Sequence, residues 1–274
     1  MPRRVLKHAR SMPYNLRANP LHALAASHAL RIFHSNAIYS FIPKNGCSTM
    51  RLSLAIANGC IEDESDINWI HNNNDTFSAD LASLMTARYT FVILRDPYAR
   101  LASCFLDKIV DKTAEAWLLY NLIDRHMNID DIAFSNFINF LADPRIRSAD
   151  IHWRPQVDFL VYEQYDDYFA LEQFDRSRKI IEDRAGLTIV DSRSLLRHGL
   201  DQWRLLPVDH DSSETPVGEI AALRRRGECP HPRSLFTDAL ISRVSELYAA
   251  DLKLFTEKTG LATQPGPTGF ASAI

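Results

Sequence analysis

The stretch YTFVIL, residues Tyr89–Leu94, is a continuous apolar run, and the turn signal RDP follows it directly. A run without the alternation of a half-exposed strand is typical of a strand buried on both faces, as in parallel sheets. A second buried strand is expected at Ala37–Ile42, and a turn and a helical pattern follow each of the two strands. This alternation predicts a three-layer α/β fold, in which helices flank a central, mainly parallel sheet.

The rest of the chain alternates between helical and extended patterns. Apolar residues at helical spacing predict helices at 48–58, 78–87, 98–110, 115–127, 131–141, 175–185 and 238–255. Short strands are expected in DINWI (66–70), VDFLVY (157–162) and DYFALEQF (167–174), whereas 191–233 is polar and poorly periodic. We expect a single domain over residues 1–261, with a loosely ordered segment at 1–20 and a disordered tail at 262–274.

The overall charge and hydrophobicity exclude some classes of protein. A net charge of −3 argues against a general polyanion binder, so we expect no nucleic-acid partner and only a local anion site. No apolar run approaches the roughly 20 residues that span a bilayer. The basic start MPRRVLKHAR lacks the apolar region of a signal peptide. The segment 21–32 is expected to be an amphipathic helix packed on the domain, with peripheral membrane association or a dimer contact as alternatives.

The four cysteines, Cys47, Cys60, Cys104 and Cys229, are widely spaced. No CxxC or Cys/His pairing suggests zinc, and we expect no metal site. Reduced thiols in a cytoplasm-like compartment are the preferred interpretation. A Cys47–Cys104 bridge is the alternative.

The first candidate site is the segment IPKNGCSTMR, which joins the expected strand at 37–42 to the next helix. Backbone N–H groups at a helix start are unpaired and lie at the positive end of the helix dipole, so they favour anions. Gly46 lets the backbone approach a ligand, and Lys44 adds a mobile positive charge. An ordinary strand-to-helix turn with a surface lysine is the alternative. The order G-x-x-x-x-G-K-[ST] of a Walker A loop is absent, which disfavours a nucleoside-triphosphate kinase.

The second candidate site is FVILRDPYARLASCFLDKI, residues Phe91–Ile109. The buried strand places Arg95 at its end, and Pro97 opens a helix, where its missing N–H costs nothing. Ser103 lies about one and a half turns into that helix. Arg95 and Ser103 can therefore hold one phosphate from two sides, the guanidinium offering a bidentate fork. The alternative is an Arg–Asp salt bridge in a turn with a small helix serine beside it.

Together, these two segments resemble the sulfotransferases that use 3′-phosphoadenosine 5′-phosphosulfate (PAPS). The resemblance is strongest to the carbohydrate sulfotransferases of family 2, which include the chondroitin and dermatan enzymes. DIHWRPQVDFL (150–160) looks like a His-Trp-x-Pro-Gln segment of that group, FALEQFDRSRKIIEDRAGL is similar to its later strand and helix, and LYAADLKLF looks like its final helix. The resemblance covers residues 38–255 and implies a P-loop-like α/β fold.

The resemblance also implies an activity and a donor site. A sulfuryl group would pass in line from PAPS to a carbohydrate hydroxyl, leaving adenosine 3′,5′-bisphosphate (PAP), with a general base and no obligatory metal. By position, Arg95 and Ser103 would hold the 3′-phosphate, and Lys44 would contact the bridging oxygen of the leaving 5′-phosphate. The residues assigned to the 5′-phosphosulfate are Pro43, Lys44, Asn45, Gly46, Cys47, Ser48 and Thr49.

The general base is less well defined by the sequence. His71 is the first candidate, against a loop histidine in a polar turn, and His152 is the second, against a packing residue beside Trp153. Glu172 is a third, although a salt bridge suits it better. Arg154 and Gln156 are expected to contact the acceptor. The run Arg224–Arg226 either closes over a phosphate or an anionic acceptor, or is a solvated basic surface.

The chain departs from the animal Golgi enzymes of this group, because it shows neither their membrane anchor nor their lumenal disulfides. We therefore expect a bacterial, cytoplasmic enzyme that acts on a surface glycan or a glycolipid precursor. The rival hypotheses are a nucleotide kinase or NTPase, which needs magnesium and a triphosphate, and a non-catalytic PAP- or glycan-binding module. The sequence leaves the oligomeric state open.

Overall fold

The computed structural model describes residues 4–9, 15–192, 195 and 200–263. The chain forms two compact units. The first unit comprises residues 1–94 and 156–196, and the second comprises 95–155 and 197–274. Because each unit is built from two separated segments, the chain passes between the units three times. The single domain over 1–261 stays a prediction, and the tail expected at 262–274 lies outside the described residues from 264 onward.

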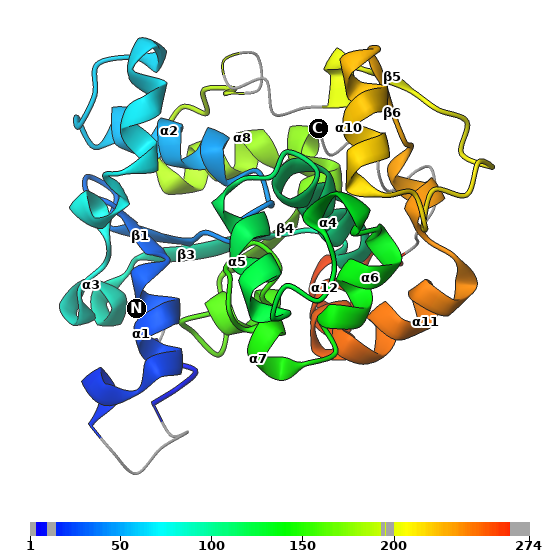
Figure 1. Cartoon of the computed structure of the whole chain (residues 1–274). Coiled ribbons are helices and arrows are strands. Elements are labelled where there is room, and N and C mark those ends of the chain that lie inside the picture. Colours follow the sequence, from blue (N-terminus) through cyan, green and yellow to red (C-terminus); the bar gives the residue numbers. More distant parts are fainter. Residues whose placement is uncertain (1–3, 10–14, 193–194, 196–199, 264–274) are drawn as a thin grey trace. The chain divides into compact units, whose positions relative to one another are not determined.

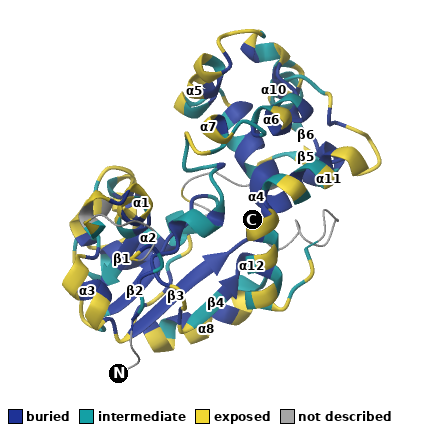
Figure 2. Cartoon of the chain, turned by 90° about the horizontal axis from the view of Figure 1, so that it is seen from below, coloured by how far each residue is buried: buried dark blue, intermediate teal, exposed yellow. Residues whose placement is uncertain are grey.

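The first unit is built on a four-stranded sheet in the order β1-β2-β3-β4. Strands β2 (Ala37–Ser40), β3 (Tyr89–Leu94) and β4 (Asp167–Ala170) are parallel, and β1 (Ala29–Ile32) pairs with β2 in the antiparallel sense. Every residue of β2 and β3 is buried, as Figure 2 shows for β3. The predicted α/β fold with a mainly parallel sheet is confirmed, and so are the predicted bounds of β3.

Helices flank this sheet, with α2 and α8 drawn above it and α1 below it in Figure 1. The α-helices of this unit are α1 (Pro20–Ser27), α2 (Cys47–Ala57), α3 (Leu81–Thr86) and α8 (Phe174–Ala185). Its 3-10 helices include η1 (Leu16–Ala18), η2 (Glu64–His71), η3 (Asn74–Phe77), η6 (Gln156–Phe159) and η7 (Leu171–Gln173). Helix α8 ends at Gly186, whose φ of 70° is the left-handed conformation of a helix C-cap.

The second unit is mainly helical around a core rich in aromatic side chains. Buried Phe105, Phe134, Phe137, Trp153 and Tyr248 belong to this core. Its helices are α4 (Pro97–Cys104), the π turn η4 (Phe105–Ile109), α5 (Ala114–Leu122), η5 (Ile129–Asp131), α6 (Phe134–Phe140), α7 (Pro144–Arg147), η8 (Leu200–Gln202), α10 (Val217–Arg225), η9 (Pro232–Leu235), α11 (Asp238–Leu247) and α12 (Ala249–Thr259). A two-stranded sheet, β5 (Arg204–Leu205) with β6 (Glu228–Cys229), lies in the stretch that was expected to be irregular, which also contains α10.

The helix expected at 21–32 is confirmed only in its first part, and its predicted end is wrong. Helix α1 ends at Ser27, and residues 29–32 form β1, the antiparallel edge of the sheet. Leu30 and Ile32 are fully buried there, so they offer no apolar face to a membrane or a second copy. Within the described residues, no helix is long and apolar enough to cross a membrane.

Two of the short predicted strands are 3-10 helices instead. DINWI lies in η2, where Ile67 and Ile70 are buried, and the first half of VDFLVY lies in η6, where Gln156 and Phe159 are buried. In both segments the buried side chains are three residues apart, which is the period of a 3-10 helix rather than of a strand. Only the first half of DYFALEQF forms the predicted strand, as β4.

The long helix expected at 238–255 is two helices. The chain breaks at Tyr248, whose φ of −118° and ψ of 28° are not helical. The ring of Tyr248 is buried, and its hydroxyl donates a hydrogen bond of 2.6 Å to the carbonyl of Trp153. This contact orients Tyr248 toward the core at the break. The remaining predicted helices are confirmed, most of them with shorter bounds.

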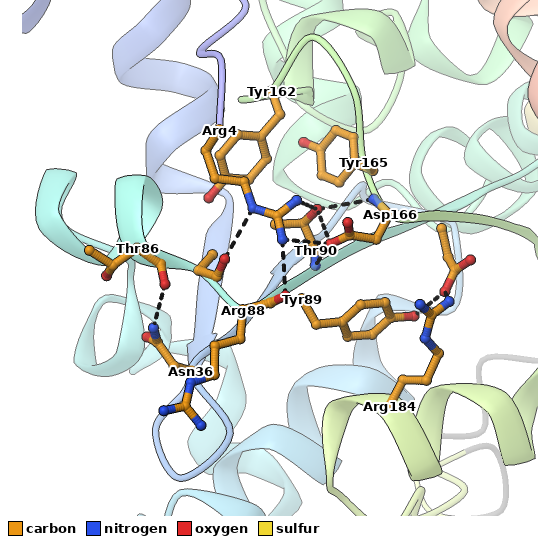
Figure 3. Close-up of polar contacts among 12 residues, drawn as sticks. Arg4, Asn36, Thr86, Arg88, Tyr89, Thr90, Tyr162, Tyr165, Asp166 and Arg184 are labelled. Carbon is orange, nitrogen blue, oxygen red and sulfur yellow. Dashed lines mark hydrogen bonds and ion pairs between the residues drawn. The ribbon is translucent and has the colours of Figure 1, made fainter. Parts of the chain in front are cut away.

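The first residues of the chain were expected to be loosely ordered, yet Arg4, Leu6 and His8 are buried. The guanidinium of Arg4 donates to the carbonyls of Ala87 and Arg88 and to Thr90 Oγ1, each at 3.1 Å (Figure 3). It also pairs with Asp166 Oδ2 at 2.7 Å. Burial by itself raises the pKa of the Asp166 carboxyl, but the bonds from Arg4 and Thr90 outweigh it and lower the pKa below the ordinary 3.8.

Replacing Arg4 should destabilise the first unit. Arg4→Ala is expected to lower the free energy of unfolding at pH 7 by about 2–3 kcal/mol, because hydrogen bonds to a charged group contribute about 1.5–3 kcal/mol. A lowered pKa of Asp166 stabilises the fold above the unfolded pKa and loses that effect as the pH falls through the folded value. The difference between wild type and variant should therefore shrink below pH 3.8, as measured by urea unfolding.

Arg88→Ala is the matched control for this test. The side chain of Arg88 is exposed, whereas its backbone carbonyl, which accepts the bond from Arg4, stays in place. The control should change stability by less than about 0.5 kcal/mol. Equal destabilisation by the two variants would show that the contacts of Arg4 do not hold this end of the chain.

Candidate functional site

The segment between β2 and α2 forms a tight loop with two left-handed residues. Lys44 has a φ of 71° and Gly46 a φ of 70°, and the amide of Asn45 donates to the carbonyl of Ile42 at 3.2 Å. For lysine, the left-handed conformation costs about 1–2 kcal/mol. Such strain is typical of sites where function fixes the backbone. A Cβ at Gly46 would lie 2.9 Å from Leu171 Cδ1, so a side chain at this position would displace Leu171.

The start of α2 is suited to an anion. Gly46 is the N-cap residue and provides no side-chain cap, and the first turn contains no acidic residue. The first amides of this helix, at Cys47, Ser48 and Thr49, therefore keep their capacity to bind an anion. Lys44 and Ser48 are both half-buried beside them. The hydroxyl of Thr49 lies 2.9 Å from Ser192 Oγ, so it is engaged with the chain after α8.

The side chains of Asn45 and Gln156 hold this loop in place by hydrogen bonds. Both side chains are fully buried, and Asn45 Nδ2 donates to Gln156 Oε1 at 2.6 Å and to the carbonyl of Ile93 at 2.9 Å. Through these bonds the two side chains fix the loop of Lys44 to β3 and to η6. The acceptor contact of Gln156 stays a prediction.

The second predicted motif begins where β3 ends. Arg95 follows Leu94 directly and is 7% exposed, and Asp96 Oδ1 accepts the amide of Tyr98 at 2.8 Å as the N-cap of α4. Ser103 is half-buried in the last turn of that helix. Since β2 and β3 are parallel neighbours, with Ser40 opposite Val92, the two motifs leave the sheet at the same carboxyl edge. Ligands of open α/β sheets bind beyond that edge.

The structure places the candidate bases in different surroundings. His71 is exposed and is the last residue of η2, not a residue after a strand. Glu172 is half-buried in η7. His152 lies in the segment 150–154, and its Nδ1 is 2.8 Å from Asp150 Oδ1 and 3.4 Å from Glu115 Oε1.

Two further groups contact the carboxylate of Glu115. Thr113 Oγ1 donates to Glu115 Oε2 at 2.5 Å, and Lys108 Nζ lies 3.6 Å from Glu115 Oε1. Burial raises the pKa of Glu115, but the bond from Thr113 and the charges of Lys108 and His152 outweigh it, so the net pKa is lowered. Glu115 is therefore ionised at neutral pH.

Glu115, Asp150 and His152 offer ligand-type atoms that all lie within 4.8 Å of one another. The ammonium of Lys108 already supplies a positive charge to this group, which favours a hydrogen-bonded cluster over a metal site. The absence of a metal stays a prediction. The four cysteines, all in the described part of the chain, are free thiols, so the alternative Cys47–Cys104 bridge is not formed.

The segment 150–154 is fixed to α4 and to the core of the second unit. Arg100 is 1% exposed and donates to the carbonyls of Arg154 at 2.7 Å and Ile151 at 3.1 Å. The indole N–H of Trp153 donates to the carbonyl of Ile146 at 2.8 Å. Arg154, a predicted acceptor contact, is half-buried.

The arginine run lies on a helix rather than in a loop. Arg224 and Arg225 end α10, and Arg224 is paired with Asp111 at 2.6 Å and stacked on Trp203. With only 8% of its side chain exposed, Arg224 is a packing residue of the second unit. Arg225 and Arg226 are exposed.

Sequence reasoning missed Asp150, Glu115 and Arg100. Asp150 stands two residues before His152, a spacing at which an Asp side chain can bond the later amide, and this signal was available. Glu115 is 35 residues away from Asp150 in the chain, and no local pattern connects them. Arg100 stands in the second motif, but nothing in the sequence indicates which carbonyls it bonds.

Comparison with known proteins identifies the family. The model of the Sulfotransferase family matches residues 28–256. This chain therefore belongs to the sulfotransferase family, as the two motifs predicted. No solved structure matches it at a significant level.

The curated relatives are carbohydrate sulfotransferases. Carbohydrate sulfotransferase 10 of Xenopus laevis is 25% identical over 231 residues, which cover 72% of this chain and 65% of the relative. The human protein of the same name is 25% identical over 61% of this chain and 55% of its own length. Human carbohydrate sulfotransferase 9 is 28% identical over 50% of this chain and 35% of its own length. The chain thus spans less than two thirds of the length of these relatives.

Proposed function

We propose that this protein transfers the sulfuryl group of PAPS to a hydroxyl of a carbohydrate. The observation that carries the proposal is the strained loop at Lys44, which leads into the anion-favouring start of α2 in a chain of the sulfotransferase family. The printed names of the relatives supply the acceptor class. A nucleotide kinase is not favoured, because the chain lacks the Walker A order and matches the sulfotransferase family.

The roles of the donor residues follow from their chemistry. Lys44 would stabilise the negative charge that develops on the bridging oxygen, and the amides at the start of α2, with Ser48, would bind the non-bridging oxygens of the 5′-phosphate. Arg95 and Ser103 would hold the 3′-phosphate. The acceptor oxygen forms a bond to sulfur while the bond from sulfur to the phosphate oxygen breaks, and the acceptor proton passes to a base. The base candidates from the sequence are His71 and His152.

The acceptor is proposed more finely as a surface glycan or glycolipid precursor, and the location as the cytoplasm of a bacterium. These proposals continue the expectations from the sequence. The acceptor proposal is tested by incubating the protein with labelled PAPS and bacterial lipid-linked saccharides, and the label should move to the saccharide. The location proposal is tested by fractionating the source cells, and the protein should appear with the cytosol.

Selective recognition of the 3′-phosphate is the decisive test. Calorimetry should show tight binding of PAP, and at least tenfold weaker binding of AMP and of ATP with magnesium. Arg95→Ala should weaken PAP binding by about 10–100-fold and leave AMP binding nearly unchanged, because it removes bonds to one charged group. Arg243→Ala, a change of a half-exposed arginine on α11, is the matched control and should alter neither affinity.

Each rival predicts a different pattern. Equal affinity for PAP and AMP would contradict the proposal, and selective binding of ATP with magnesium would support a kinase. A binding module would retain PAP selectivity but transfer no label from PAPS, and loss of either candidate base would leave it unchanged.

A further inference from the structure

We propose that His152 is the general base and that Asp150 and Glu115 are positioning residues that keep its proton on Nδ1. This inference rests on the proposed function and names the part of the site that receives the acceptor's proton. It selects the second of the two histidines that the sequence nominated. Neither carboxylate has a role in the donor site.

The contacts of the ring determine which nitrogen can accept a proton. Asp150 Oδ1, at 2.8 Å, and Glu115 Oε1, at 3.4 Å, both face Nδ1. An ionised carboxylate only accepts hydrogen bonds, so Nδ1 must donate and carry the proton. Nε2 then carries the lone pair, which is the arrangement of a histidine base oriented by a carboxylate. The side chain is 19% exposed, which allows access from solvent.

The same carboxylate also fixes the backbone beneath the ring. Asp150 Oδ1 accepts the amide of His152 at 2.8 Å in addition to Nδ1. The amide of Arg154 bonds the carbonyl of Asp150 at 3.0 Å, which closes one helical turn around the histidine. Asp150 therefore holds both the ring and the backbone of His152. A general base needs such a fixed ring orientation to meet the acceptor's proton.

Hydrogen bonds hold this segment to the helix of the second donor motif, and the residue that bonds the loop of the first motif follows it in the chain. In the second unit, Arg100 of α4, the helix that carries Ser103, bonds the carbonyls of Ile151 and Arg154. In the first unit, Gln156 bonds Asn45 in the loop of Lys44. Gln156 follows His152 by four positions, so the chain keeps their Cα atoms within about 14 Å. His71, by contrast, is exposed at the end of η2.

The charges around His152 suit a group that gains a proton. During transfer the acceptor O–S bond forms, the bond from sulfur to the 5′-phosphate oxygen breaks, and the acceptor proton moves to Nε2. The imidazolium is then stabilised by the two carboxylates that face its Nδ1, until the proton leaves to water. Lys108 Nζ lies 3.6 Å from both Asp107 Oδ2 and Glu115 Oε1, so one ammonium offsets only part of the negative charge of the carboxylates around His152.

The first test measures the tautomer and does not depend on finding the acceptor. Nitrogen-15 NMR of the histidine rings should show the proton of neutral His152 on Nδ1. Asp150→Ala should lose this preference, whereas PAP affinity stays within twofold in both proteins. A proton on Nε2 in the wild type would overturn the proposal. Failure of PAP binding in the wild type would instead overturn the proposed function.

The second test measures rates with labelled PAPS and a mixture of p-nitrophenyl galactoside, glucuronide and N-acetylglucosaminide. His152→Gln should lower kcat by about 100-fold or more, and His71→Gln by less than threefold. Asp150→Asn keeps an acceptor for the amide but removes the charge. It should lower kcat about tenfold and move the acidic limb of the pH profile to lower pH, since the imidazolium loses a neighbouring negative charge. Glu115→Gln should also lower kcat and move the acidic limb to lower pH, each by less than Asp150→Asn does.

Asp143→Asn is the matched control for Asp150→Asn. Asp143 Oδ1 accepts the amide two residues later at 2.8 Å, as Asp150 does, but that residue is Arg145. The control should leave the pH profile unchanged. A pH profile of Asp150→Asn identical to that of wild type would show a merely structural role. A large loss in His71→Gln alone, or a rate that disappears on chelation and returns with a divalent cation, would equally contradict the proposal.

Discussion

Lys44→Met should lower kcat by about 100–1,000-fold, which is the effect of deleting a single oxyanion-type donor. The ammonium opposes charge that develops on the bridging oxygen only as the bond to sulfur breaks, so its loss raises the barrier more than it weakens donor binding. The affinity for PAP should therefore fall by less than tenfold. Both quantities are measured directly, by single-turnover transfer of label from PAPS and by calorimetry.

Two further variants separate the charge of Lys44 from its backbone conformation. Lys44→Gly also removes the charge but relieves the left-handed backbone, so it should be more stable than Lys44→Met by about 1 kcal/mol and equally inactive. Lys179→Met is the matched control, because Lys179 is 83% exposed on α8 and only pairs with Asp183. It should keep full activity. Full activity of Lys44→Gly would show that Lys44 contributes through the backbone of the loop and not through its charge.

The sheet was predictable wherever a strand is buried on both faces. Residues of β3 are all apolar or aromatic apart from Thr90, and a six-residue buried strand has few other interpretations. The same reasoning failed at 29–32, because the apolar residues of α1 and β1 follow one another and imitate a single helical stripe. Only the pairing of β1 with β2, a tertiary contact, decides between the two.

The donor site was more predictable than the base. Lys44, Gly46 and the start of α2 act through backbone geometry that a strand, a tight turn and a helix impose locally, so the sequence pattern contains most of the information. The environment of His152 depends on Glu115, which comes from helix α5, and no spacing rule connects the two residues. The burial of Gln156 and its bond to Asn45 could not be predicted either, because a motif does not reveal which of its polar residues are buried.

The residues of the short segment His152–Gln156 have different roles. His152 faces two carboxylates, the indole of Trp153 fills the core, and the amide of Gln156 holds the loop of Lys44. Trp153 is fully buried, packs edge-on to Phe137 with ring centroids 5.9 Å apart, and accepts the hydroxyl of Tyr248 on its carbonyl. Because Trp153 is anchored in the core, it fixes the position of the adjacent His152.

Trp153→Ala should accordingly lower the free energy of unfolding by about 3–5 kcal/mol, the usual result of emptying a large aromatic site in a core. Trp153→Phe refills most of the volume but leaves the carbonyl of Ile146 without its indole donor, so it should cost about 1–2 kcal/mol. Urea unfolding, followed by circular dichroism, measures both changes. Activity should fall more in Trp153→Ala than in Trp153→Phe, because a shift of residue 153 displaces the adjacent His152.

Trp117→Ala provides the matched comparison, because Trp117 belongs to the same unit but is 47% exposed on α5. Its removal should cost less than about 1 kcal/mol, as expected of a surface position. A stability loss in Trp153→Ala no larger than in Trp117→Ala would mean that the tryptophan of the motif does not anchor the segment. The orientation of His152 would then have to come from Asp150 and Arg100 alone, and Trp153→Ala would leave the pH profile of transfer unchanged.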